Sequence, residues 1–249
     1  VTLGALTLDT PYACALGGAA LTFGADGAGG TLAVDPGSHA LDSAVNLPAD
    51  LSVVAQPGAR VNMGGGVTGS GRVVVTGGGT LAITNGAAFD VPVTLDGAAL
   101  GATASTTVDS ALTAGAGGAT LNPSTGVTLT LSGVIDGAGA LIKDGSNIVV
   151  IDGTNACTGE VSVQSGTLDV STLEAGGPLV LGAGRLRYTG TNAVVSRGFT
   201  IRTRDAKLGA TFASDADVTF NGTVAAESGV FIKAGSGTVT FAAPGVNRF

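Results

Sequence analysis

The strongest constraint on the fold is a unit of short apolar runs and glycine corners that fills residues 141–170. β-Branched runs at 148–151 and 161–163, and the alternating Leu168-Asp169-Val170, have the pattern of strands with one buried face. The pairs that separate these runs are Asp144-Gly145, Asp152-Gly153, Thr158-Gly159 and Ser165-Gly166. Because glycine takes the positive φ of a sharp corner, the segment predicts strands joined by tight corners, which describe a coil.

The same unit recurs elsewhere in the chain. Residues 139–145 align with residues 229–235, and residues 71–77 form a looser third copy, so the copies begin 68 and then 90 residues apart. These intervals suit three or four stacked turns of roughly 20–25 residues each, the short end of the repeat lengths of solenoids. The repeat-like units lie near 46–84, 126–170 and 218–249. The sequence therefore predicts one continuous solenoid over residues 1–249.

Short strands of the same form are expected along the rest of the chain. They are expected at 6–8, 21–23, 32–34, 51–53, 73–75, 81–83, 91–95, 119–121, 179–181, 186–188, 199–201, 218–220 and 239–241. Their alternation alone would also fit a sandwich of hairpins, and the recurring unit favours the coil. With only three glutamates among 249 residues, little or no helix is expected. The expected fold class is all-β.

Residues 141–170 closely resemble the autotransporter-associated β-strand repeat. The residues that match its pattern are Lys143, Gly145, Gly153, Asn155, Gly159, Gly166, Leu168 and Val170. Residues 181–190 and 196–200 are similar to the stretch that often links two such repeats, and the resemblance extends over about 126–249. Asn147 stands where the family has a glycine, and Cys157 stands where it has an aromatic residue.

The resemblance implies a location and a role as well as a fold. It implies a right-handed parallel β-helix, a handedness that the crossover rule also favours. It implies the passenger region of a type V secreted protein, extracellular or on the surface of a Gram-negative cell. Such a passenger would act as a rigid structural stalk or adhesin, and its outer-membrane translocator would lie outside these residues.

Composition excludes several other classes of protein. The formal net charge of −7 and a pI near 4.4 argue against binding to nucleic acid, which requires clustered cations. A hydrophobic content of 44% and a mean hydropathy of +0.47 argue against disorder. The sequence contains no stretch of 18 consecutive apolar residues, the length expected of a membrane-spanning helix. The chain begins in strand-like sequence and not in the pattern of a signal peptide. We expect a mature or excised piece of a longer protein.

The sequence offers little for catalysis. The single histidine, His39, is interpreted as a surface residue in a turn, and the acidic pair Asp215 and Asp217 as solvated turn residues. A β-helical enzyme that degrades polysaccharide would need converging carboxylates, with or without calcium. We expect no catalytic, cofactor or metal site, which leaves the enzyme as a disfavoured alternative.

The cationic residues of the chain are concentrated in one cluster. Six of the eleven cationic residues fall within residues 185–207. Residues two apart on a strand share a face, so these cations would form a basic patch if the turns stack in register. The candidate patch for an anionic ligand, such as a host or matrix glycan or protein, comprises Arg185, Arg187, Arg202, Arg204 and Lys207. The family often has arginine at the positions of Arg187 and Arg197, which favours a structural role for both.

The open ends of the coil are expected to bind further copies of the chain. An uncovered terminal turn exposes unpaired backbone groups, so self-association through open ends is expected, and a filament of end-to-end stacked solenoids is an alternative function.

Cys14 and Cys157 lie 143 residues apart, several turns along the coil, and should not form a disulfide. Cys157 is expected to be buried as a small hydrophobic residue.

Overall fold

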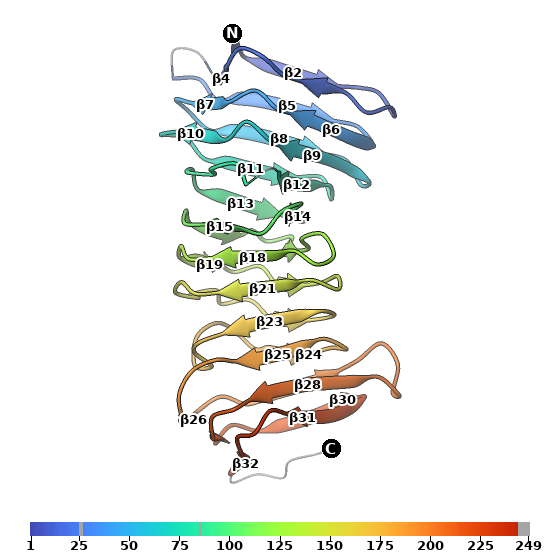
Figure 1. Ribbon diagram of the computed structural model, residues 1–249, viewed down its shortest axis with the longest axis vertical. Coiled ribbons are helices and arrows are strands. Elements are labelled where there is room, and N and C mark those ends of the chain that lie inside the picture. Colours follow the sequence, from blue (N-terminus) through green and yellow to red (C-terminus); the bar gives the residue numbers. More distant parts are fainter. Residues whose placement is uncertain (25–26, 85, 244–249) are drawn as a thin grey trace.

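The chain folds into a stack of parallel strands, as the repeated unit predicts. A computed structural model describes residues 1–24, 27–84 and 86–243, which contain 32 strands and no helix. Each strand pairs in parallel with the strand one turn away, and the turns rise along one long axis (Figure 1). The all-β parallel coil is therefore confirmed, and its right-handed sense stays a prediction. Residues 244–249, the end of the last repeat-like unit, lie outside the described residues.

The strands of the described residues form five sheets. Sheet A contains β1 (Thr2–Leu3), β4 (Leu21–Phe23), β7 (Val45–Leu47) and β10 (Val67–Gly69). Sheet B contains β2 (Ala5–Leu8), β5 (Gly30–Val34), β8 (Leu51–Ala55), β11 (Val73–Thr76), β13 (Val93–Asp96), β16 (Leu112–Ala114) and β19 (Ile135–Gly137). Sheet E contains β26 (Ala193–Val195), β29 (Val218–Phe220) and β32 (Val239–Phe241).

The other two sheets both include strands of the cationic cluster. Sheet C extends along nearly the whole described chain, whereas sheet D begins at Thr106. Sheet C contains β3 (Ala15–Leu16), β6 (Gly37–Leu41), β9 (Ala59–Met63), β12 (Thr80–Ile83), β14 (Ala98–Ala102), β17 (Ala119–Leu121), β20 (Leu141–Lys143), β22 (Val161–Val163), β24 (Leu179–Leu181), β27 (Phe199–Arg202) and β30 (Val224–Ser228). Sheet D contains β15 (Thr106–Val108), β18 (Thr128–Leu131), β21 (Ile148–Ile151), β23 (Thr167–Val170), β25 (Arg185–Tyr188), β28 (Gly209–Ser214) and β31 (Val230–Ala234).

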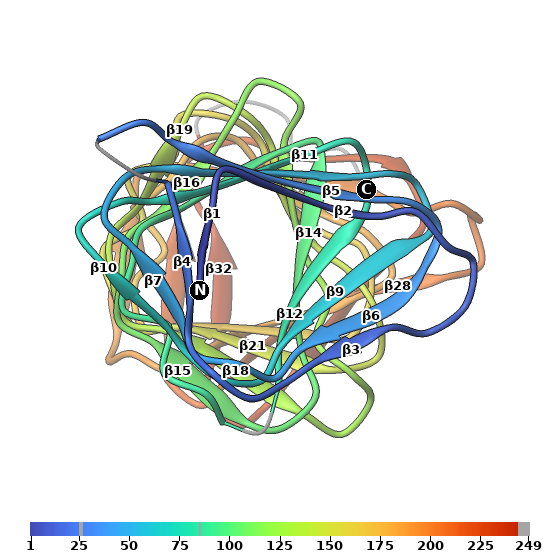
Figure 2. The same ribbon diagram turned by 90° about the horizontal axis from the view of Figure 1, so that it is seen from above.

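Sheet C contributes one strand to every turn, so the described residues make about eleven turns. The chain passes through sheets A, B and C in the first turns and through D, E and C in the last, and the sheets surround a common axis (Figure 2). Paired residues in adjacent turns are separated by between 18 residues, as for Ser162 and Val180, and 26 residues, as for Leu6 and Leu32. This range includes the predicted turn length.

The core is built from columns of inward-facing side chains. Leu32 pairs with Val53, Val53 with Val75, and Val75 with Leu95, and none of these four side chains is exposed to solvent. Because alternate residues of a strand face opposite sides, each apolar-polar-apolar run adds two side chains to such columns. Stacked apolar side chains and the backbone ladders together hold each turn on the next.

The three copies of the repeated unit do not lie above one another. Their strands are β11 in sheet B, β20 in sheet C and β31 in sheet D. The intervals between copies are therefore three turns plus one strand and four turns plus one strand, close to the three or four turns that were expected. The shared sequence specifies one strand and the corner that follows it, and either can occur on any face of the coil.

Strand positions were predicted well wherever turn chemistry bounded them. Strands β17, β24, β29 and β32 have the expected bounds. The strand expected at 91–95 begins at Val93, because Pro92 has no backbone N–H to donate to a ladder. Several strands, including β6, β9 and β14, were not expected.

His39 was wrongly interpreted as a surface residue. It lies in β6, its side chain is fully buried, and it pairs with Val61 of β9. Leu41 of the same strand faces inward beside His39, since residues two apart on a strand share a face. A Cβ on Gly37 would lie 2.8 Å from the Nε2 atom of His39, so the glycine leaves room for the ring. Neither ring nitrogen has a hydrogen-bond partner among the described residues.

Candidate functional site

The structure divides the candidate basic patch between two sheets. Arg185 and Arg187 project outward from β25 in sheet D, whereas Arg202 ends β27 in sheet C. Arg204 and Lys207 lie in the exposed loop between β27 and β28. The four arginines therefore do not form one ladder, and only Arg185 and Arg187 share a strand face.

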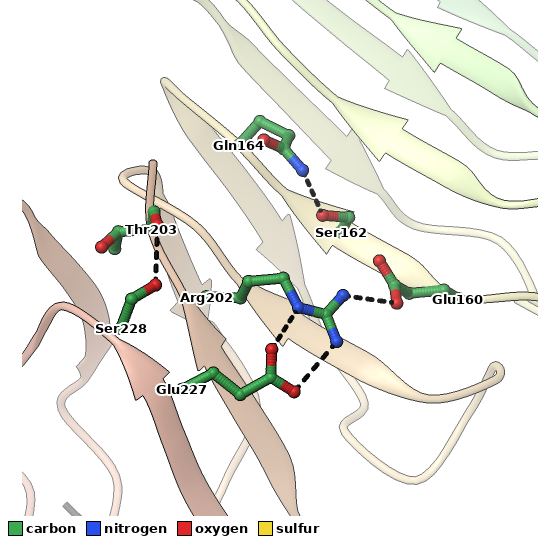
Figure 3. A network of polar contacts seen from close by, with 7 residues as sticks. All are labelled: Glu160, Ser162, Gln164, Arg202, Thr203, Glu227 and Ser228. Carbon is green, nitrogen blue, oxygen red and sulfur yellow. Dashed lines mark hydrogen bonds and ion pairs between the residues drawn. The ribbon is translucent and has the colours of Figure 1, made fainter. Parts of the chain in front are cut away.

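Arg202 is held by two carboxylates (Figure 3). Its Nε and Nη2 atoms donate to Glu227 at 2.7 and 3.2 Å, and its Nη1 atom donates to Glu160 at 3.2 Å. The register of β27 and β30 shifts after Ile201, so Arg202 pairs with Ser228, and this irregularity leaves Glu227 beside the guanidinium. The ion pair with Arg202 lowers the pKa of the Glu227 carboxyl and raises that of Arg202.

Arg187 forms an ion pair within its own sheet. Its Nε atom donates to the Oδ1 atom of Asp169 at 2.8 Å, and its Nη2 atom donates to the other carboxylate oxygen. Asp169 lies directly opposite on β23 and is only 3% exposed, so its carboxylate depends on this partner. The hydrogen bond raises the pKa of Arg187. This contact supports the structural part that the sequence suggested for Arg187.

Arg197 has a structural role as well. Its half-buried guanidinium donates to the carbonyls of Ala175, Gly176 and Gly177, in the connection between β23 and β24. Burial lowers the pKa of Arg197, while Glu174 acts in the opposite direction. Because these carbonyls have no place in a strand ladder, the arginine satisfies acceptors that the corner would otherwise leave bare.

Arg185 and Arg204 are the less engaged members of the cluster. Within the described residues, neither side chain donates a hydrogen bond, and each lies near one carboxylate, Asp215 for Arg185 and Asp144 for Arg204. The pKa of Asp215 is lowered mainly by the backbone N–H and hydroxyl of Ser236. Binding of an anionic ligand by the candidate patch stays a prediction.

The acidic pair occupies corners, as the sequence interpretation suggested. Asp215 accepts from the backbone N–H of Ser236 at 2.8 Å, and Asp217 accepts from that of Thr238 at 2.7 Å. Both acids are exposed in the turn between β28 and β29. Over residues 1–24, 27–84 and 86–243, no group of three or more histidine, cysteine or acidic side chains could hold a metal ion.

The sequence reasoning missed a lysine that closes the corner of the repeated unit. The Nζ atom of Lys143 donates to the carbonyls of Asp144, Gly145 and Ser165 at 2.9, 2.8 and 3.0 Å. Lys233 in the aligned copy makes the same kind of contact, with the carbonyls of the next two residues and with Ser214 of the adjacent turn. The alignment of residues 139–145 with 229–235 could have indicated this role, because it places both lysines near the end of a strand.

Both cysteines are unpaired thiols in the structure. Cys157 is 2% exposed, as expected for the position where the family has an aromatic residue, and its thiol donates to the carbonyl of Asp136 at 3.2 Å.

No helix that could cross a membrane occurs in the part of the chain that the structure describes.

Comparison with known proteins links part of the chain to an autotransporter. Over 114 residues, or 44% of this chain, it is 38% identical to the protein named "Adhesin BmaC autotransporter" from Brucella suis biovar 1 (strain 1330). The match spans only 3% of that protein. No protein-family profile and no solved structure matches the chain. The partial match and the parallel coil are together consistent with an autotransporter passenger, and the particular repeat family stays a prediction.

Proposed function

We propose that this chain is part of a non-enzymatic, cell-surface or extracellular passenger that acts as a rigid stalk or adhesin of a Gram-negative bacterium. The observation that carries the proposal is the coil of parallel turns in a chain that partly resembles an autotransporter adhesin. About eleven turns at about 4.8 Å each give a rod of about 50 Å.

The contacts between turns support the rigidity that a stalk needs. Each turn is bonded to the next through up to three backbone ladders, and sheet C runs from the first described turn to the last. A repeat protein of this kind derives its stability from contacts between neighbours, so its length can increase without a new core. The outer-membrane translocator expected outside these residues belongs to the same proposal.

Binding partners are a separate part of the proposal. A host or matrix glycan or protein would bind the lateral faces of the coil, and copies would associate through strand edges at open ends. Sedimentation of the polypeptide over a range of concentrations tests the second idea. A mass that stays monomeric at every concentration would exclude association through the ends.

The experiment for surface display uses intact cells of the Gram-negative bacterium that carries the gene. An antibody raised against the 249-residue polypeptide should label unpermeabilised cells, and external protease should remove the label. A periplasmic protein serves as the control and should be labelled only after permeabilisation. Labelling that requires permeabilisation would overturn the proposed location.

A further inference from the structure

We propose that a groove beside Arg185 and Arg187 binds a short segment of an anionic saccharide through its carboxylate or sulfate groups. This inference rests on the proposed adhesive function, and it selects one site from the divided basic cluster. The groove has a volume of about 380 Å³. Its lining includes Arg185, Arg187, Ala213, Asp215 and Gly235.

The groove lies on the side of the coil. It is formed where β25 and β28 of sheet D run into their corners, next to the corner that follows β31. Its floor includes Ala213, which pairs directly with Arg187, so a small side chain lies beside a long one. The difference in side-chain length leaves open space next to the guanidinium.

The two arginines offer donors that the fold does not use. Arg185 donates no side-chain hydrogen bond within the described residues, so its guanidinium keeps its full set of N–H groups. Arg187 uses Nε and Nη2 for Asp169, which fixes its orientation and leaves Nη1 for a ligand. The two residues lie about 7 Å apart on one strand face, and a planar guanidinium matches the oxygens of a carboxylate or sulfate.

Asp215 makes a saccharide the better occupant than a simple anion. Its carboxylate lines the same groove and lies close enough to Arg185 for the arginine to lower its pKa. A phosphate ion or an acidic peptide would meet repulsion from this carboxylate. A sugar carries hydroxyl groups that donate to a carboxylate, together with the anionic group that the arginines bind.

The size of the groove limits the occupant to a few sugar units. Sites for small molecules usually enclose about 300–1,000 Å³, whereas a stable protein partner needs about 800 Å² of surface on each side. A groove of about 380 Å³ belongs to the first class. The saccharide would lie along the side of the stalk, so several copies of the protein could bind one polymer.

The test is a calorimetric titration of the 249-residue polypeptide at low ionic strength. The probes are a galacturonate trisaccharide, a sulfated heparin-derived tetrasaccharide, neutral maltotriose and a tetraglutamate peptide. We expect one or both anionic saccharides to bind and the other two probes not to bind. The carboxylated and sulfated probes distinguish the two sources of anionic group.

Arg185→Ala is the decisive variant, since Arg185 supports no other described residue by a side-chain hydrogen bond. Loss of its charged hydrogen bonds should weaken saccharide binding by about tenfold or more. Arg72→Ala is the matched control, because it removes the same charge from an exposed side chain that lies outside both the groove and the candidate patch. It should leave the affinity within about twofold of the wild type, apart from long-range screening.

Three results would overturn the proposal. They are no binding of either anionic saccharide by the wild type, equal losses in Arg185→Ala and Arg72→Ala, and equal binding of tetraglutamate. Thermal unfolding of both variants checks that each is folded. A failure of surface labelling would instead overturn the proposed function, and it would leave the saccharide titration unaffected.

Discussion

Lys143 places an ammonium group inside a coil whose interior is mostly aliphatic. Its side chain is 1% exposed, and burial lowers its pKa to about 8, with Asp144 opposing the shift. The three carbonyls around Nζ favour the protonated form at neutral pH. The residue therefore combines the cost of a buried charge with the closure of a corner through hydrogen bonds to three carbonyls.

Lys143→Met should lower the free energy of unfolding by roughly 1–3 kcal/mol at neutral pH, because the carbonyls lose their donor. The difference should grow as pH rises from about 8 toward 10.5, since the unfolded lysine stays protonated after the folded one has lost its proton. Over this pH range the difference in free energy of unfolding between the two proteins should increase by about 3 kcal/mol. Urea unfolding of both proteins between pH 7 and 10.5 measures it, and a constant difference would contradict the lowered pKa.

Cys157 should be far less reactive than Cys14. Burial raises the pKa of the Cys157 thiol to about 11, with a smaller contribution from Asp136, so almost no thiolate forms near neutral pH. Cys14 is only partly buried. Iodoacetamide should modify Cys14 first in the folded protein and both thiols at similar rates in urea, as followed by mass spectrometry. Equal rates in the folded protein would show that Cys157 is accessible.

The corners determine the stability of each strand unit. Gly137 ends β19 with φ +109°, and a Cβ there would lie 2.1 Å from the carbonyl oxygen of Ala114 in the neighbouring turn. Gly137→Ala should destabilise the protein by about 2–4 kcal/mol, because both the backbone and the adjacent turn must move. Gly4→Ala is the control, since its added Cβ would meet no atom within 4 Å. Similar unfolding midpoints for both variants would contradict the close packing of the corners.

Sequence reasoning predicted the elements better than their placement. Alternating runs bounded by glycine gave the strands and their inward faces, because both signals are local. The face that each strand occupies depends on the varying length of the turns before it, so the sequence did not show that the repeated units lie on three different sheets. The contact between Arg202 and Glu227 depends on a register shift, and the burial of His39 depends on the strand beside it. Neither has a local signature.

The isolated 249-residue polypeptide should open from its ends rather than all at once. The inward side chains of β11, Val73 and Val75, are fully buried, whereas the strands of the first and last described turns are partly exposed. In a coil where each turn contacts only its neighbours, opening is easiest where one neighbour is absent. Hydrogen exchange of the 249-residue polypeptide should be slowest in β8–β16 and fastest in β1–β3 and β30–β32. Uniform exchange would indicate a single cooperative unit.

The position of the repeated unit on three different sheets has a consequence for how such a chain can evolve. A gene segment that encodes one strand and its lysine- or glycine-closed corner can be duplicated or lost without preserving the phase of the coil. The strands that follow move to the next face, and their alternation still directs apolar side chains inward. Rods of this design can therefore lengthen in steps smaller than one turn, which gives selection fine control over the length of the rod.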